Sequence, residues 1–276
     1  MWKIDEIFNV LGKERSSADQ ILITGVSIDS RTIKRGEIFI ALEGENYDGH
    51  KFIEQALDKG ASLVIANKTK CINKFPIITV RDTKATLINL ARFARNRIKN
   101  LLVIAVTGSS GKTTLKEWLF QILKDDYNSY CNFGNFNNEI GMPLTLLNMP
   151  KNTQICILEI GMNNRGEIQK LAEIAKPNIK IITNIGFAHI GNLKSKKKIA
   201  IEKSEIFTFY SKNGISIIPR DDEFFEYLLK KASKFKSEKV LSFGRNIKST
   251  FRIIENSKQK KDVKIFLSKK KITIKK

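Results

Sequence analysis

The 276-residue sequence has few of the residues that build metal clusters and disulfide frameworks. It contains two histidines, His50 and His189, and three scattered cysteines, none of them in a Cys-x-x-Cys pair. A His/Cys zinc site is therefore nearly excluded, and the cysteines are expected to be reduced thiols. No apolar run approaches the ~20 residues that span a bilayer, and the first residues lack the apolar segment of a signal peptide. We expect a cytoplasmic protein with no membrane insertion.

Acidic residues are also in short supply. The chain carries 49 Lys and Arg against 28 Asp and Glu, a net charge of +21. One interpretation is a basic, nucleic-acid-binding ATPase. The other is a lysine-rich composition combined with anionic small-molecule substrates. The lysines are spread along the whole chain rather than gathered in one stripe with aromatic residues, so we favour the second and expect no nucleic-acid partner.

The most informative motif is Thr-Gly-Ser-Ser-Gly-Lys-Thr-Thr at 107–114. It follows the apolar run 101–106 and precedes the amphipathic stretch 115–123, which gives the order strand, glycine-rich turn, helix. Such a turn lets backbone N–H groups close on phosphate oxygens at a helix N-terminus. A bare glycine turn with an exposed lysine would not explain that order. The sequence predicts ATP or GTP binding by Thr107, Gly108, Ser109, Ser110, Gly111, Lys112, Thr113 and Thr114.

Within this motif, Lys112 can reach the β- and γ-phosphates and Thr113 can bind Mg²⁺. The usual pattern has a glycine where this chain has Val106, so the loop is a short variant.

The pattern of apolar segments predicts an α/β fold. After residue 100, nearly all-apolar strands alternate with helices, which indicates a mostly parallel sheet covered on both faces. The expected strands are 101–107, 154–160, 179–185 and 214–218, and the expected helices are 112–124, 164–175, 197–209 and 222–233. Residues 1–82 alternate shorter elements and are predicted to form a small α/β domain. Asp82 is a plausible N-cap for a helix over 83–99, so we place the boundary there, with a second domain over 83–276.

Polar groups follow several of these strands. Glu159 ends one strand and can hold Mg²⁺ directly or through water; alternatively it caps a neighbouring helix. His189 follows the next strand, and although a lone histidine is more often structural, its place predicts a role in the site. The carboxyl ends of parallel strands share one edge of the sheet, so we expect 107–114, 159–161 and 183–189 to form one active site.

Two further polar segments are candidates for substrate binding. The asparagine-rich stretch 132–147 includes Asn137 and Asn138, whose amides suit an amide- or sugar-bearing substrate, although a surface loop would look the same. In the first domain, Ser30, Arg31 and His50 could bind an anionic group, or could be a polar turn between strands.

Together these motifs resemble the Mur ligases, ATP-dependent amide-forming enzymes of peptidoglycan precursor synthesis. Asp29-Ser-Arg31, the stretch 36–42 and Asp48-Gly-His50 are similar to the UDP-binding first domain, which adds Asp48 to the substrate-binding candidates. Residues 107–114 are similar to the family's own short phosphate loop. The stretches 134–147, 159–162 and 166–168 look most like the members that add D-alanyl-D-alanine to UDP-N-acetylmuramoyl-tripeptide. The resemblance covers about residues 20–245.

The resemblance implies a mechanism. The substrate's terminal carboxylate attacks the γ-phosphate of ATP, and the amine of D-alanyl-D-alanine displaces phosphate from the resulting acyl phosphate. The resemblance also implies that Thr113 and Glu159 bind Mg²⁺ and that His189 holds a second ion. Lys203 matches the family lysine that is carbamylated, a role that the sequence by itself gives no reason to assign. Lys112, His189 and Lys203 are thus the expected catalytic residues.

The sequence differs from the family in one respect. Mur ligases have a third domain, and no part of this sequence resembles it. We therefore expect a chain truncated within its central domain, with the C-terminal ligase domain absent, and we expect little or no amide product from this chain alone. One alternative is a non-catalytic nucleotide-binding module that needs a separate chain carrying the third domain. Folate-polyglutamylating enzymes are close in mechanism, but the first-domain motifs favour a UDP-sugar substrate.

Overall fold

The computed structural model describes residues 2–14, 21–45, 47–68, 70, 76–187, 195–255, 262–267 and 270–275. His189 and Cys71 lie outside these ranges. The chain divides into two compact units, residues 1–100 with 140–153, and residues 101–139 with 154–276. Within the described residues, no helix is both long and apolar enough to cross a membrane.

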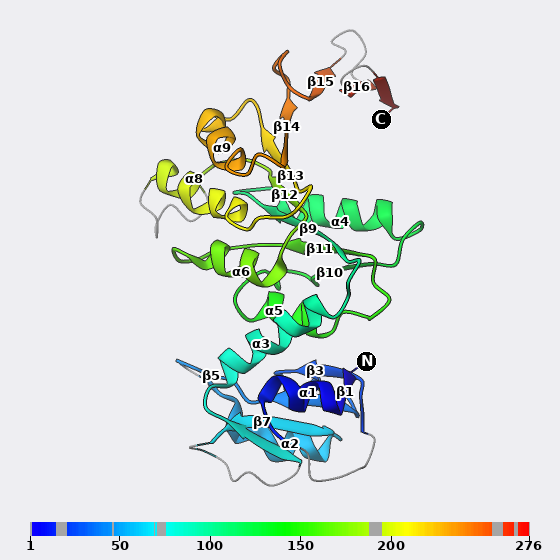
Figure 1. Ribbon diagram of the computed structural model, residues 1–276, viewed down its shortest axis with the longest axis vertical. Coiled ribbons are helices and arrows are strands. Elements are labelled where there is room, and N and C mark those ends of the chain that lie inside the picture. Colours follow the sequence, from blue (N-terminus) through cyan, green and yellow to red (C-terminus); the bar gives the residue numbers. More distant parts are fainter. Residues whose placement is uncertain are drawn as a thin grey trace. The chain divides into compact units, whose positions relative to one another are not determined.

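The first unit contains a four-stranded parallel sheet in the order β3-β4-β7-β8. The helix α2 lies on one face of this sheet, and α1 and α3 lie on the other (Figure 1). Beneath α2, Phe39 and Val64 pack against Ile53 and Ala56 in a buried cluster. The elements are β1 (Trp2–Lys3), α1 (Ile4–Leu11), β2 (Leu22–Ile23), β3 (Gly25–Ser27), β4 (Glu37–Ile40), β5 (Glu43–Gly44), β6 (Tyr47–Asp48), η1 (Gly49–Phe52), α2 (Ile53–Asp58), β7 (Leu63–Asn67), β8 (Ile77–Val80) and α3 (Thr83–Asn96).

Helix α3 begins where the sequence indicates, since the Asp82 side chain accepts a hydrogen bond from the backbone N–H of Ala85 at 2.9 Å. Its apolar stripe packs against α1 and against α5 (Gly141–Leu147). The compact first unit therefore extends to residue 100, whereas the sequence favoured a boundary near residue 82.

Residues 140–153 return to the first unit from the middle of the second. The Asn148 side chain binds both backbone groups of Val26, accepting from its N–H and donating to its C=O, each at 2.9 Å. The indole N–H of Trp2 donates to the Leu147 carbonyl at 2.9 Å. The polar pattern of 132–147 gave no sign of this excursion.

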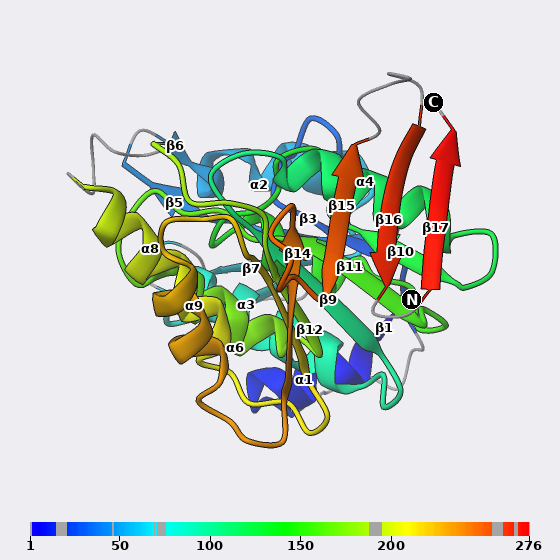
Figure 2. The same ribbon diagram turned by 90° about the horizontal axis from the view of Figure 1, so that it is seen from above.

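The second unit is built on a nine-stranded sheet in the order β10-β11-β9-β12-β13-β14-β15-β16-β17. The pairings are parallel as far as β15, and β16 and β17 continue the sheet antiparallel (Figure 2). The strands are β9 (Leu102–Thr107), β10 (Ser129–Cys131), β11 (Ile155–Glu159), β12 (Ile179–Ile182), β13 (Ile215–Pro219), β14 (Lys239–Gly244), β15 (Phe251–Glu255), β16 (Asp262–Leu267) and β17 (Lys270–Lys275).

Helices cover both faces of this sheet, as the apolar strands predict. Helix α4 lies on one face, and α6, α8 and α9 lie on the other (Figure 1). Under α4, Ile104, Val106 and Ile157 pack against Leu115 and Leu119. The helices are α4 (Lys112–Leu123), α6 (Glu167–Ala175), α8 (Lys196–Ser204) followed by η2 (Glu205–Phe207), and α9 (Phe225–Ala232). The predicted α/β class with a mostly parallel sheet is confirmed.

Candidate nucleotide and metal site

The phosphate loop, residues 107–114, connects β9 to α4 as the sequence predicts. Gly108 and Gly111 have positive φ angles of 149° and 77°. A Cβ on Gly108 would lie 1.8 Å from Thr183 Oγ1, so no side chain fits there. No side chain caps the N-terminus of α4, and helix geometry leaves the backbone N–H groups of its first turn without intrahelical partners. These donors can bind a phosphate group.

Residues after β12 hold the loop in this shape. Thr183 Oγ1 donates to the Ser110 carbonyl at 2.7 Å. The backbone N–H of Ser109 donates to the Asn184 carbonyl at 3.0 Å, and that of Ser110 donates to Asn184 Oδ1 at 3.1 Å. The expectation that 107–114 and 183–189 meet is confirmed for the described part, 183–187. The amides of Ser109 and Ser110 are used to fix the loop, which leaves those at the start of α4 for a ligand.

Lys112 opens α4 and folds back over the loop. Its ammonium donates to the Gly108 carbonyl at 2.9 Å and contacts the Ser109 carbonyl at 3.4 Å. Burial lowers the pKa of Lys112, and the negative charge of Glu159 opposes this shift. The lysine therefore lies where phosphate oxygens on the loop would meet a cation.

Glu159, at the end of β11, faces the first turn of α4. Thr113 Oγ1 donates to its Oε2 at 2.7 Å, and Asn137 Nδ2 donates to its Oε1 at 2.6 Å. The carboxylate is almost completely buried, with 2% of the residue exposed. Three positions that the sequence singled out, from α4, β11 and the asparagine-rich loop, are thus in direct contact.

This arrangement fits Mg²⁺, which prefers oxygen ligands and retains several waters. Thr113 and Glu159 offer a hydroxyl and a carboxylate oxygen beside the phosphate loop. Thr107 Oγ1, completely buried at the end of β9, has no hydrogen-bond partner among the described residues. No group of three or more His, Cys, Asp and Glu suited to a metal occurs in the described part of the chain, so phosphate and water would complete the coordination.

Lys203 in α8 is buried, with 1% of the residue exposed. Burial, together with the nearby charge of Lys112, lowers its pKa to about 7, while Glu202 opposes the shift. Glu202 Oε1 accepts the backbone N–H of Gly166 at 2.6 Å, and burial raises its pKa. Lysines on helices are usually exposed, so the sequence alone gives no sign that Lys203 is buried.

The remaining predicted residues of this unit differ in their surroundings. Thr114 and Asn138 are exposed, Thr114 on the first turn of α4 and Asn138 after Asn137 in the loop. The position of His189 lies outside the described residues.

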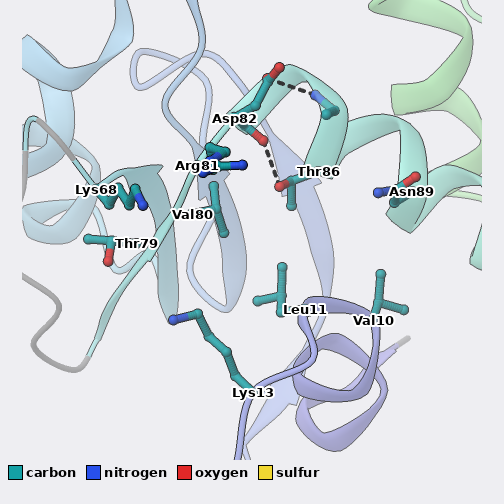
Figure 3. A pocket seen from close by; sticks show the side chains of 11 residues that line it. Val10, Leu11, Lys13, Lys68, Thr79, Val80, Arg81, Asp82, Thr86 and Asn89 are labelled. Atoms are coloured by element: carbon teal, nitrogen blue, oxygen red, sulfur yellow. Dashed lines mark hydrogen bonds between the residues drawn. The ribbon is translucent and has the colours of Figure 1, made fainter.

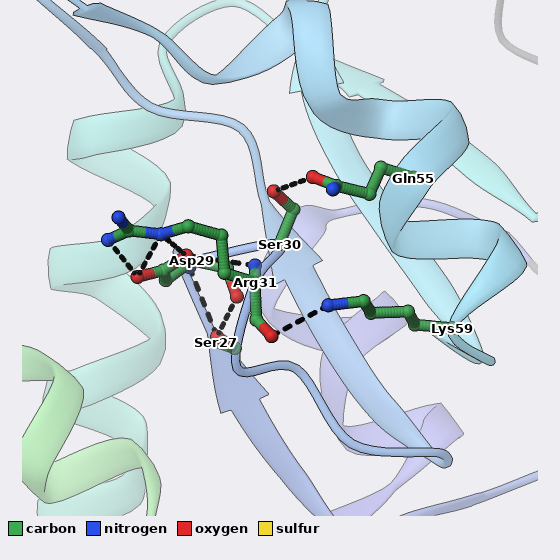
Figure 4. Close-up of polar contacts among 6 residues, drawn as sticks. All are labelled: Ser27, Asp29, Ser30, Arg31, Gln55 and Lys59. Atoms are coloured by element: carbon green, nitrogen blue, oxygen red, sulfur yellow. Dashed lines mark hydrogen bonds and ion pairs between the residues drawn. The ribbon is translucent and has the colours of Figure 1, made fainter.

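In the first unit, Asp29, Ser30 and Arg31 follow β3. Arg31 forms a bidentate ion pair with Asp29, with the closest contact at 2.7 Å, and 81% of its side chain is exposed (Figure 4). This contact lowers the pKa of Asp29. Ser30 is buried and donates to Gln55 Oε1 at 2.6 Å.

A cavity of about 440 Å³ opens beside this turn. Tyr47 and Phe52 form part of its lining, and their rings stack with centroids 5.4 Å apart and planes 9° apart. Arg31 also lines the cavity. A ligand in the cavity could therefore place a planar ring against the aromatic residues and an anionic group against Arg31.

The side chains of His50 and Asp48 form hydrogen bonds and ion pairs within the first unit. The backbone N–H of Asn67 donates to His50 Nε2 at 2.9 Å, so the ring proton lies on Nδ1, which donates to Asp48 Oδ1 at 2.6 Å. Lys70 contacts Asp48 at 2.7 Å, and together with His50 it holds the pKa of Asp48 well below its usual range. Both ring nitrogens of His50 are thus engaged in the fold.

A second cavity of the first unit, of about 460 Å³, lies beside the start of α3 (Figure 3). Lys13, Lys68 and Arg81 line it, and none of them makes an ion pair with a described residue. Lys68 and Arg81 are exposed, so water can solvate their charges. No sequence motif pointed to this cavity.

Sequence reasoning missed two residues that organise the surroundings of Glu159. Lys116 lies completely buried on α4 and binds the asparagine-rich loop, and Asn132 binds the backbone of Glu159. Asn132 lies in the asparagine-rich segment, which was the available signal. A lysine one turn after Lys112 gives no signal in the sequence, because helical lysines are usually exposed.

Comparisons with known proteins agree with this geometry. Residues 106–276 match the family model of the Mur ligase middle domain, and residues 22–106 match that of the Mur ligase family, catalytic domain. A UDP-N-acetylmuramoyl-tripeptide--D-alanyl-D-alanine ligase of Rickettsia prowazekii is 38% identical over 255 residues, covering 92% of this chain and 56% of the relative. The corresponding ligase of Bacillus subtilis is 40% identical over 206 residues, covering 74% and 45%.

Solved structures show the same likeness. MurF from Acinetobacter baumannii superposes with a TM-score of 0.87 at 30% identity, covering 99% of this chain and 60% of that one. MurF from Thermotoga maritima, solved in complex with ADP, has a TM-score of 0.78 at 31% identity, covering 92% and 58%. The chain spans about half the length of the curated relatives it matches. The chain belongs to the Mur ligase family.

Proposed function

We propose that this chain provides the UDP-sugar-binding and ATP-binding parts of a ligase that adds D-alanyl-D-alanine to UDP-N-acetylmuramoyl-tripeptide. The single observation that carries this is the contact of Thr113 with Glu159 beside the phosphate loop. The names of the relatives at 38% and 40% identity support the choice of substrates.

The reaction forms an amide from a carboxylate, which is a poor acyl donor until it is phosphorylated. The terminal carboxylate of the tripeptide forms a bond to the γ-phosphorus of ATP, and the bond from that phosphorus to the β–γ bridging oxygen breaks, releasing ADP. The amine nitrogen of D-alanyl-D-alanine then bonds to the acyl carbon, loses a proton and displaces phosphate. Mg²⁺, when bound, neutralises phosphate charge during the transfer.

The chain's own groups have distinct roles in this proposal. The amides of the first turn of α4 and the ammonium of Lys112 bind and orient the phosphates. Thr113 and Glu159 hold Mg²⁺, and His189 is proposed to hold a second ion. Lys203 is proposed to be carbamylated, which converts a buried cation into a carboxylate that supports the metal. Asn137 and Asn138 are proposed to contact the substrate.

In the first unit, we propose that the UDP-sugar binds beside the turn that follows β3. The cavity of about 440 Å³, with its stacked Tyr47 and Phe52, supports this placement. Arg31 is the exposed cation there, and Ser30, Asp48 and His50 complete the proposed set, the last two by shaping the turn around Gly49.

The first half-reaction provides the test, because it needs no incoming amine. The protein is incubated with Mg-ATP and UDP-N-acetylmuramoyl-tripeptide, and hydroxylamine traps the acyl phosphate as a hydroxamate. We expect phosphate release and hydroxamate only when the tripeptide substrate is present, and neither with Lys112→Ala. ATP binding without substrate-dependent phosphate release would favour the non-catalytic nucleotide-binding module instead.

A further inference from the structure

Lys116 is a completely buried lysine on α4, one turn after Lys112. Its ammonium donates to the carbonyls of Asn132 at 2.8 Å and Gly134 at 3.1 Å, and lies 2.9 Å from Glu117 Oε1. An ammonium has three donors, and three acceptors surround this one. The cost of burying the charge is therefore offset locally rather than by solvent.

Two of those acceptors belong to the turn over residues 132–137, which is neither helix nor strand. An apolar residue at position 116 would fill the same space in α4 but would leave the two carbonyls without this donor. A lysine here is therefore explained by the loop it holds rather than by the helix it belongs to.

The loop that Lys116 binds forms hydrogen bonds with Glu159. Asn132 Oδ1 accepts the backbone N–H of Glu159 at 2.9 Å, and Asn132 Nδ2 donates to the backbone carbonyl of the same residue at 3.2 Å. Asn137 Nδ2 donates to the carboxylate at 2.6 Å, and the Asn137 carbonyl accepts from the N–H of Gly161 at 2.9 Å. The loop thus fixes both the backbone and the carboxylate of Glu159.

We propose that Lys116 is a positioning residue that orients the carboxylate of Glu159 through the loop over residues 132–137. The relevance of this carboxylate to Mg²⁺ rests on the proposed function. Helix α4 then carries three connected groups. Lys112 faces the phosphate loop, and Thr113 forms a hydrogen bond with the Glu159 carboxylate. Lys116 orients the same carboxylate indirectly, through the loop over residues 132–137. A helix that binds phosphate at its N-terminus thereby also sets the position of the metal ligand.

The first measurement is made without nucleotide or metal, by hydrogen–deuterium exchange on the whole chain. Lys116→Met removes the charge and the donors, and Lys116→Arg keeps a cation that can donate. Lys124→Met, an exposed lysine at the end of the same helix, is the matched control. We expect faster exchange at the amides of Glu159 and Gly161 in Lys116→Met, partial recovery in Lys116→Arg, and no change in Lys124→Met.

The second measurement is the apparent Kd for Mg²⁺ at saturating ADP, taken by calorimetry in a double-mutant cycle with Glu159→Gln. Lys116→Met should raise this Kd by up to about 10-fold, the lower end of the range for groups bonded directly to a metal ligand, because Lys116 acts on Glu159 through Asn132. In the Glu159→Gln background, Lys116→Met should add little, because the group through which it acts has lost its charge. A purely structural role would instead give the same loss in both backgrounds.

The two measurements separate the inference from the proposed function. Unchanged exchange at Glu159 and Gly161 in Lys116→Met overturns the positioning role, whether or not the protein binds nucleotide. Equal effects of Lys116→Met in both backgrounds also overturn it, as does failure of both Lys116 variants to fold. A wild-type chain that shows no Mg²⁺-dependent ADP binding overturns the proposed function, while the exchange data still decide whether Lys116 holds Glu159.

Discussion

Thr113 and Glu159, 46 residues apart in sequence, are joined by a hydrogen bond of 2.7 Å between the hydroxyl and the carboxylate. The bond connects the first turn of α4 to the end of β11. We expect Glu159→Gln to weaken Mg²⁺ binding in the presence of ADP by at least about 10- to 100-fold, because even partners of metal ligands have effects of this size. Titration of Mg²⁺ by calorimetry measures the effect.

Glutamine keeps the shape of Glu159 and can still accept from Asn137, so the far-ultraviolet circular dichroism and the unfolding midpoint of Glu159→Gln should match those of the wild type. A variant that loses its fold while its remaining folded fraction binds Mg²⁺ normally would mean that Glu159 is structural.

Lys112 supplies the cation of the phosphate loop. Lys112→Ala should lower the affinity for Mg-ATP by roughly 10- to 150-fold, since a hydrogen bond to a charged group contributes about 1.5–3 kcal/mol. Calorimetry with Mg-ATP measures the change, and Lys124→Ala on the same helix is the control. Unchanged affinity in Lys112→Ala would show that the loop does not bind the triphosphate in the proposed way.

The central strands of the second unit and the helices between them could be predicted from the sequence because their signals are local. Apolar runs such as 101–106 and 155–158 become buried strands, and the glycine-rich loop between a strand and a helix has a geometry that few other functions require. The positions of Thr113 and Glu159 followed from one rule, since the carboxyl ends of parallel strands share an edge. For these residues, chain order and sheet topology were sufficient.

Other features depend on contacts between distant segments, for which a single sequence carries no signal. The return of residues 140–153 to the first unit, fixed by Asn148 and Val26, is of this kind. So is the burial of Lys116 and Lys203, two lysines on helices where exposure is the usual outcome. Their environment is set by what packs over them, and the residue type alone argues for the opposite placement.

Arg31 and His50 were both expected to bind an anionic group, yet their surroundings differ. The Arg31 side chain is exposed and forms its ion pair with Asp29, whereas His50 uses both ring nitrogens in the fold. Arg31→Ala should change the free energy of unfolding by under about 1 kcal/mol and weaken binding of the UDP-sugar substrate. His50→Ala should cost about 1–3 kcal/mol of stability.

Urea unfolding and calorimetric titration of UDP-N-acetylmuramoyl-tripeptide test the two variants in parallel. The assignment of Arg31 to the substrate site would be lost if Arg31→Ala bound this substrate as tightly as the wild type does.

Lys180 of β12 and Glu238 form a completely buried ion pair, with ammonium–carboxylate distances of 2.7 and 2.8 Å. Glu238 Oε1 also accepts the N–H of Ser211 at 2.7 Å. Lys180→Met should destabilise the second unit by about 3–5 kcal/mol, because it leaves a buried carboxylate without its partner. Adding Glu238→Gln should restore much of this loss, since glutamine is neutral and can still accept from Ser211.

Unfolding of the second unit is followed by hydrogen–deuterium exchange at the amides of β12 and β13 in increasing urea. If the double variant is no more stable than Lys180→Met alone, the loss of unfolding free energy in Lys180→Met does not come from the unpaired charge of Glu238.

Lys203 has the electrostatic environment that carbamylation requires. The neutral amine reacts with CO₂, and an ordinary lysine with a pKa of about 10.4 is almost entirely protonated at neutral pH. Burial and the charge of Lys112 lower the pKa of Lys203 to about 7, so about half of its amines are neutral at that pH. Carbamate formation should therefore rise as the pH increases from 6 to 8.

The measurement is ¹³C NMR of the protein in ¹³C-bicarbonate. We expect a carbamate signal that strengthens through pH 7 in the wild type, is absent in Lys203→Met, and persists in the control Lys198→Met, which changes an exposed lysine of the same helix. In Lys112→Met, removal of the neighbouring positive charge raises the pKa of Lys203, so the onset of the signal should move to higher pH. A signal that survives in Lys203→Met would assign the carbamate to another amine, and a complete absence of signal in the wild type would remove Lys203 from the proposed metal site.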